Sequence, residues 1–196
     1  MTNPIADISP RKTAIIVGAL FLIALFADLL SMFISENITL MLLEIIAGVA
    51  IIGIGVTMFP ILKPHNKSLA LGYLVCRSIE GVIFIVSAIF SATFIFSGIL
   101  HLIYVYIFGL GALMLYYLLY QSKLVPRFIS VWGLIAITLL LIANAFGLLG
   151  RDPAMTIFFA LPIILNELFL AIWLIVKGFN EDAIASGSAK TDINNN

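Results

Sequence analysis

Eight side chains that can carry charge or form hydrogen bonds lie inside stretches of sequence that are otherwise apolar. Four are carboxylates, one is a guanidinium, one is an imidazole and two are amides: Asp28, Glu44, Glu80, Glu167, Arg77, His101, Asn144 and Asn166. A single guanidinium cannot neutralise four carboxylates, so some of these acids must be protonated, hydrated or bound to a cation. Such a set suits either a binding site for a small molecule or ion, or an acid and a base acting on a substrate.

The composition identifies the solvent around these side chains. Of 196 residues, 63% are hydrophobic and only 10% are charged, and the mean hydropathy is +1.21. A soluble domain has roughly a quarter of its residues charged, so the lipid bilayer is the expected partner of most of this chain. The ten basic residues balance the ten acidic ones, which gives no indication of a nucleic-acid partner. The single cysteine excludes an internal disulfide.

The hydrophobic stretches predict an all-α integral membrane protein with six transmembrane helices. A bilayer core about 30 Å thick needs roughly 20 apolar residues in a helix. Six segments meet this requirement, and together they form one domain over residues 13–179: residues 13–33, 39–62, 69–96, 98–120, 128–149 and 154–176. The break at Ser97-Gly98 is the least marked of the five. We expect residues 1–12 to be an N-terminal tail and residues 180–196 a flexible C-terminal one.

Basic residues give the predicted orientation. Eight of the ten lie before the first segment, after the sixth, or in the loops that follow the second and fourth, whereas the other three loops contain only Arg151. The positive-inside rule then places both termini in the cytoplasm. We therefore predict a multi-pass protein of the inner or plasma membrane, with an even number of spans.

Depth can be estimated by counting from the nearest basic residue at the cytoplasmic side. Arg77 and Glu167 both come out roughly 15 Å deep, near the midplane, and Asn166 and Glu80 at about 17–20 Å. Asp28, Asn144 and Glu44 follow at about 24–28 Å, and His101 lies near the outer surface. The polar residues thus run from the midplane outward, which predicts a pocket open to the extracytoplasmic side.

Helical phase indicates that the polar residues face other helices. Tyr73, Arg77 and Glu80 follow the spacing of three and four residues that defines one helix face. Arg77 can pair with Glu80 or with Glu167, and the sequence leaves this choice open. Such a pair can also serve only to fix the helix register.

Small residues predict where helices pack closely. Glu44 shares a face with Gly48 and Gly55, and Asn144 shares one with Gly133. Glycine allows close contact between helices in membranes, so these two polar side chains should face neighbouring helices. Pro162 removes a backbone hydrogen bond and predicts a kink beside Glu167.

Several kinds of chemistry lack the residues that they need. No lysine lies within a predicted span, which excludes a retinal-type Schiff base. One membrane histidine and scattered carboxylates would suit a hard cation at best, and we predict no metal site. The sequence contains no nucleophile elbow and no nucleotide-binding loop, and it indicates no particular cofactor.

Four stretches resemble a family of small bacterial integral membrane proteins known only as a domain of unknown function. They are R-x-x-E-G at residues 77–81, G-L-G-A-L-M-L-Y-Y-L-L-Y at 109–120, K-L-V-P-R-F-I-S-V-W-G-L at 123–134, and L-P-I-I-L-N-E with W-L-I-V-K-G-F within 161–179. The resemblance covers residues 11–179 and implies a bacterial inner-membrane protein with six spans. It implies no activity. Its motifs include Arg77, Glu80, Asn166 and Glu167.

Three functions remain open at this point. The first is a non-enzymatic bundle that binds a small molecule or ion as a carrier or sensor, with Arg77 facing an anion or neutralising charge, Glu80 and Glu167 as its partners or as proton acceptors, and Asn166 as an orienting donor. The second is an enzyme acting on a lipid or quinone-like substrate, with Glu80 or Glu167 as acid or base. The third is a scaffold whose polar core is purely structural. The chain has no clear internal repeat of the kind that many carriers have, and a homodimer would partly compensate for this.

Overall fold

Six long helices make up the membrane domain of the protein. The computed structural model describes residues 9–31, 34, 37–90, 99–148 and 153–186. Its long helices are α1 (Pro10–Ser31), α2 (Asn37–Leu62), α3 (Lys67–Phe90), α4 (Ile99–Ser122), α5 (Arg127–Ala145) and α6 (Pro153–Val176). Each contains a segment long and apolar enough to cross a membrane, and the described residues include no strand. The predicted all-helical fold with six spans is therefore confirmed.

The described helix boundaries agree with the predicted segments to within a few residues. The predicted end of the third span, residue 96, lies outside the described residues, and α3 is described as far as Phe90. The break at Ser97-Gly98 lies outside the described residues. Pro162 lies inside α6, which continues as a helix on both sides of it.

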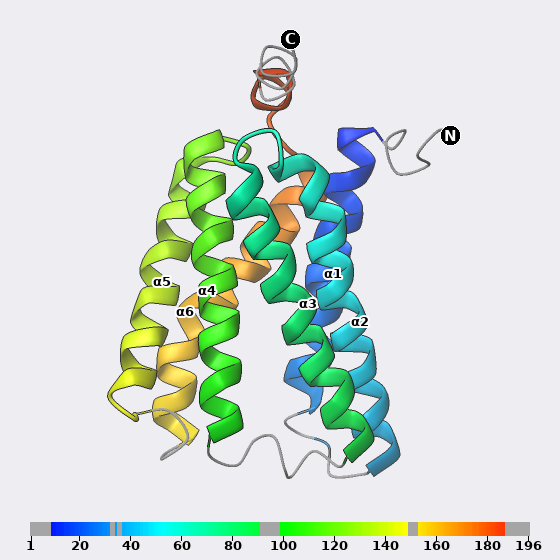
Figure 1. Cartoon of the computed structure of the whole chain (residues 1–196), viewed down its shortest axis with the longest axis vertical. Coiled ribbons are helices and arrows are strands. Elements are labelled where there is room, and N and C mark those ends of the chain that lie inside the picture. Colours follow the sequence, from blue (N-terminus) through cyan, green and yellow to red (C-terminus); the bar gives the residue numbers. More distant parts are fainter. Residues whose placement is uncertain (1–8, 32–33, 35–36, 91–98, 149–152, 187–196) are drawn as a thin grey trace.

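The helices form a closed ring around a central axis. Each helix packs chiefly against its neighbours in the sequence, and α6 returns to pack against α1. Figure 1 shows α6 crossing obliquely behind the other helices to close this ring. Side chains that point inward from all six helices can therefore meet at the centre, even when they are far apart in the sequence.

Helices pack closely at the three glycines for which the sequence predicted close contacts. A Cβ atom on Gly48 of α2 would lie 2.6 Å from the carbonyl oxygen of Gly81 in α3, and one on Gly55 would lie 2.9 Å from Cβ of Arg77. On the other side of the ring, Gly133 of α5 packs directly on the ring of Tyr116 in α4. These contacts hold the backbones close together in a medium that offers little hydrophobic driving force.

Both ends of the helical domain lie at the same end of the bundle. Figure 1 shows α1 beginning and α6 ending at this end. The Arg11 guanidinium donates hydrogen bonds to the last carbonyl groups of α6, with Nη2 at 2.7 Å from the oxygen of Ile175 and 3.1 Å from that of Val176. A cation there also complements the negative end of the helix dipole. Gly178, with φ of +80°, then turns the chain beneath Arg11.

The described residues after α6 pack against the bundle. Residues 181–186 are helical, and the side chain of Ala183 belongs to the buried core together with Phe179. The Asn180 amide N–H donates to the carbonyl of Leu124 at 2.9 Å. The first part of the tail that we expected to be flexible is thus a short packed helix.

The outer surface of the ring is apolar, and the interior is closely packed towards one end of the bundle. Large side chains such as Ile38, Phe146 and Phe158 are at least two-thirds exposed, which is what lipid-facing positions require. The largest fully buried side chains lie mainly towards the end where α1 begins, and include Leu62, Leu118, Leu119, Leu124 and Ile129. We call this the basic end, because Lys12, Lys63, Lys67, Lys123, Arg127 and Lys177 lie there.

Candidate functional site

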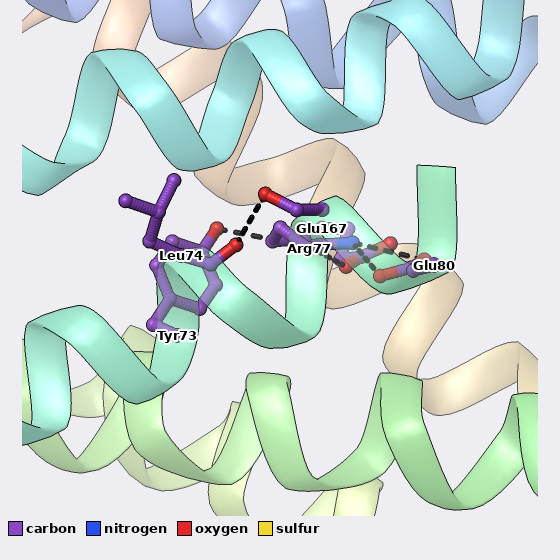
Figure 2. A network of polar contacts seen from close by, with 6 residues as sticks. Tyr73, Leu74, Arg77, Glu80 and Glu167 are labelled. Atoms are coloured by element: carbon purple, nitrogen blue, oxygen red, sulfur yellow. Dashed lines mark hydrogen bonds and ion pairs between the residues drawn. The ribbon is translucent and has the colours of Figure 1, made fainter. Parts of the chain in front are cut away.

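Arg77 is the centre of a network of charged and polar side chains inside the ring (Figure 2). Tyr73, Arg77 and Glu80 occupy one face of α3, as their spacing predicted. Arg77 Nε donates to the Tyr73 hydroxyl at 3.2 Å, and its Nη1 donates to both carboxylate oxygens of Glu80 at 3.1 and 3.0 Å. Its Nη2 donates to Oε1 of Glu167 on α6 at 3.3 Å. Arg77 therefore pairs with both candidate partners rather than with one of them.

The guanidinium of Arg77 is enclosed as well as paired. Its side chain is 5% exposed, and those of Glu80 and Glu167 are 3% and 14% exposed. The rings of Phe21, Tyr73 and Phe108 lie with their centroids 5.5, 5.6 and 5.7 Å from its Cζ atom. Cation–π contacts of this kind stabilise a desolvated cation. Because all three guanidinium nitrogens already donate, Arg77 is held in place and has little capacity left for a further anion.

A cavity of about 160 Å³ lies beside this network, with side chains from all six helices on its wall. At about 30 Å³ for each water molecule, it has room for roughly five waters. Its polar lining consists of Asp28, Arg77, Glu80, Tyr104, Thr156 and Glu167. The remainder of the wall is apolar or aromatic. The ring thus contains a small cavity with charged groups on part of its wall.

Aromatic side chains form an ordered section of the cavity wall. Tyr104 of α4 packs edge to face on Phe84 of α3, with ring centroids 5.6 Å apart. It also stacks on Phe108, one turn along α4, at 6.5 Å. Phe84 shares the face of Arg77 and Glu80 in the sequence. Phe21 and Phe108 carried no comparable signal, because an aromatic residue in an apolar span is indistinguishable from ordinary core.

The nine residues that the sequence selected do not all lie at this cavity. Four of them line it: Asp28, Arg77, Glu80 and Glu167. A fifth, Tyr73, does not line it but accepts a hydrogen bond from Arg77. The other four are Glu44, Asn144, Asn166 and His101, and none of them belongs to the described lining.

Glu44 and Asn166 are directed between pairs of helices. Glu44 is buried in α2 beside Ser87 of α3. Asn166 is fully buried, and its Nδ2 donates to the backbone carbonyl of Ile129 in α5 at 3.0 Å. Successive residues on a helix point about 100° apart, so Asn166 and Glu167 cannot face the same side. Asn166 therefore joins α6 to α5, and the orienting role at the site that we expected for it has no support in this geometry.

Asn144 and His101 are the remaining two of these four residues. Asn144 is 2% exposed in α5, and neither amide atom has a hydrogen-bond partner within the described part of the chain. The prediction that Asn144 shares its face with Gly133 agrees with the burial of both residues. His101 lies in α4, but its side chain is outside the described residues.

The described residues were also compared with what a metal ion needs as ligands. Among the described residues, no three His, Cys, Asp or Glu side chains come close enough together to hold a metal ion. The chemistry available at the cavity is that of carboxylates, one guanidinium, hydroxyl groups and aromatic faces.

The fold defines a multi-pass helical membrane protein, and charged side chains lie inside it beside a cavity. Comparison with protein families narrows this class. The model of the family described as "Domain of unknown function (DUF4386)" matches residues 14–98 and 95–178. The chain therefore belongs to this family, which confirms the resemblance to a family known only as a domain of unknown function. Comparisons with curated proteins and with solved structures find no match.

Proposed function

We propose that the protein binds a small molecule or ion in its central cavity and acts as a carrier or sensor for it. The supporting observation is a chamber of about 160 Å³ inside a ring of six membrane-spanning helices, with one guanidinium and three carboxylates on its wall. Ionisable groups within the membrane cost free energy and usually mark pathways or binding sites for substrates and ions.

The charges on the wall favour a positively charged ligand, or a proton. Arg77 carries one positive charge, whereas Asp28, Glu80 and Glu167 carry three negative charges when all are ionised. Arg77 already donates to Tyr73 and to two of the carboxylates, so its role is to neutralise and position them. Asp28 has no salt bridge within the described residues. It is the carboxylate that we assign to the ligand.

The aromatic section of the wall supports the same assignment. The faces of Tyr104, Phe84 and Phe108 carry negative electrostatic potential, and they attract cations in desolvated sites. They also give the chamber an apolar surface that suits the hydrocarbon part of an organic ammonium ion. A small organic cation therefore matches both parts of the wall.

We propose that the ligand enters from the end opposite the basic end. Asp28 lies in the last turn of α1, and Thr156 in the first turn of α6, so the cavity lining extends towards this end. If the basic end is cytoplasmic, as the positive-inside rule predicts, the entrance is on the extracytoplasmic side of the cell membrane.

A second candidate is a polar core that only fixes packing, and the complete pairing of Arg77 favours it. A buried ion pair can determine how helices register without binding anything. The two candidates differ in what Glu80 and Asp28 do. A packing role needs no free volume beside them, whereas a binding role uses the chamber that both side chains line.

The test is a titration of the purified protein with tetramethylammonium and tetraethylammonium, followed by thermal unfolding. A ligand present at a hundred times its Kd stabilises the folded state by about 2.7 kcal/mol, and we expect such stabilisation for wild type. Asp28→Asn and Glu80→Gln should remove the response. Glu44→Gln is the matched control, because Glu44 is a buried membrane carboxylate outside the cavity lining. A lack of response to cationic, neutral and anionic probes alike would favour the packing role.

A further inference from the structure

A second pocket lies at the basic end, between the α4–α5 loop and the end of α6. Its volume is about 510 Å³. The side chains around it include three cations and one indole: Lys123, Arg127, Lys177 and Trp173. Of the residues that the structure describes, no acidic one lines it. The pocket is separate from the central cavity, with which it shares no lining residue.

Backbone contacts hold the two walls of this pocket together. The amide N–H of Asn180 donates to the carbonyl of Leu124 at 2.9 Å, and the Asn180 side-chain Nδ2 donates to the carbonyl of Lys123 at 3.4 Å. Asn180 Oδ1 in turn accepts from the amide of Asp182 at 3.1 Å. These hydrogen bonds therefore join the chain beyond α6 to the α4–α5 loop, which brings the backbone positions of the three cationic residues around one pocket.

The cations around this pocket have no anionic partners within the described residues. Among the described residues, the ion pairs are those of Arg77 with Glu80 and Glu167, which lie at the central cavity and not at this pocket. Glu181 and Asp182 follow the pocket in sequence and are exposed, but they do not line it and form no ion pair with its cations. Arg127 is oriented by the ring of Tyr120, whose centroid is 5.3 Å from its Cζ atom. Three positively charged residues therefore line this pocket, and none of them has an acidic partner in the described part of the chain.

We propose that this pocket binds the phosphate group of an anionic phospholipid. Arginine and lysine are the side chains that recognise phosphate, by hydrogen bonds and by charge. The pocket lies where α4 and α6 end and α5 begins, and the ends of membrane-spanning helices are where lipid headgroups are expected. Trp173 belongs to the type of residue that anchors at this interface. Basic pockets between transmembrane helices are known sites for anionic headgroups.

The pocket also explains the distribution of charge at the basic end. Lys12, Lys63 and Lys67 are exposed at the same end, but none lines the pocket. These three residues satisfy the requirement for positive charge beside the spans without forming a site. The lipid that we propose binds to the other three cations, and its chemistry is independent of whatever enters the central cavity.

The test is native mass spectrometry of the full-length protein with phosphatidylglycerol and phosphatidylcholine. The pocket variant is Lys123→Asn, Arg127→Gln and Lys177→Gln. Asparagine is chosen at residue 123 because φ is +59° there, a conformation that asparagine tolerates. The control variant is Lys12→Gln, Lys63→Gln and Lys67→Gln, which removes the same charge from the same end of the bundle. Both variants are checked for a monodisperse, helical fold.

Wild type and the control should retain phosphatidylglycerol in preference to phosphatidylcholine. The pocket variant should bind phosphatidylglycerol at least about tenfold more weakly, since each interfacial cation contributes to attraction for anionic lipid. Lys123→Arg with Lys177→Arg should keep the preference. An equal loss in pocket and control variants would overturn the proposal, as would equal binding of both lipids by wild type. Glycerol 3-phosphate bound as tightly as the lipid would assign the pocket to a soluble phosphate and would also overturn it.

Discussion

The two halves of the bundle differ in how their interiors are filled. Towards the basic end, side chains such as Leu62, Leu118 and Leu119 are fully buried and interlock without charged groups between them. Towards the other end, the interior contains Glu80 and a cavity that reaches as far as Asp28. A membrane protein gains little from exchanging lipid for protein apolar contacts, so cohesion must come from close packing in one half and from polar contacts in the other.

This difference suggests a division of roles. The closely packed half fixes the relative positions of the helices at the level of Arg77. Because the helices are held in place there, the cavity in the open half can persist. A gap in a protein interior otherwise closes when the surrounding side chains move into it. The network around Arg77 lies between the two halves.

The largest expected effect comes from breaking this network. Arg77→Leu leaves Glu80 and Glu167 buried without their cation, and removal of one partner from a buried ion pair costs about 3–5 kcal/mol. We expect the purified variant to lose most of its thermal stability, as measured by circular dichroism and gel filtration.

The triple variant Arg77→Leu, Glu80→Leu and Glu167→Leu separates the two roles of the network. Replacement of a whole buried ion pair by apolar side chains is often neutral for stability, so the triple variant should recover a monodisperse fold. It should nevertheless lose binding of organic cations. Full retention of cation binding in this variant would contradict a role for these carboxylates at the site.

A smaller effect is expected in the closely packed half. Gly133→Ala places a methyl group against the ring of Tyr116, which is fully buried and cannot move aside. Overpacking of this kind costs about 1–3 kcal/mol, and the unfolding temperature should fall accordingly. Gly53→Ala is the control, because its Cβ would approach only the flexible end of Leu20, at 3.2 Å. Equal losses in the two variants would show that the packed half is not especially tight.

The smallest effect concerns the hydrogen bond between α6 and α5. Asn166→Leu removes the donor to the Ile129 carbonyl, and such bonds contribute about 0.6 kcal/mol on average inside membrane proteins. We expect a small loss of stability in thermal unfolding and unchanged cation binding, because Asn166 does not line the cavity. Loss of cation binding would show that Asn166 does contribute to the binding site.

The sequence was sufficient to predict the six helices because each needs only about 20 apolar residues between polar breaks. It also predicted that Arg77 and Glu80 share a face, since this depends on local spacing alone. The contact of Arg77 with Glu167 spans 90 residues. It depends on which helices become neighbours, and no local pattern contains that information.

Counting residues gives only the position of a side chain along the helix axis, and not the direction in which it points. Asp28 and Glu44 were assigned similar depths, yet Asp28 lines the cavity while Glu44 lies beside Ser87. Asn166 and Glu167 are adjacent in sequence but point to different neighbours. Rise along a helix follows from residue number, whereas the direction in which a side chain points relative to other helices requires the assembled ring.

The most direct test of the central claim is to locate a cation inside the protein. Crystals of wild type soaked with (2-bromoethyl)trimethylammonium would provide an anomalous bromine signal. We predict a bromine peak within the cavity bounded by Asp28, Glu80 and Tyr104, and no such peak in Asp28→Asn crystals. A chamber filled by protein side chains or lipid in wild-type crystals, with no bromine peak inside the ring, would contradict the account.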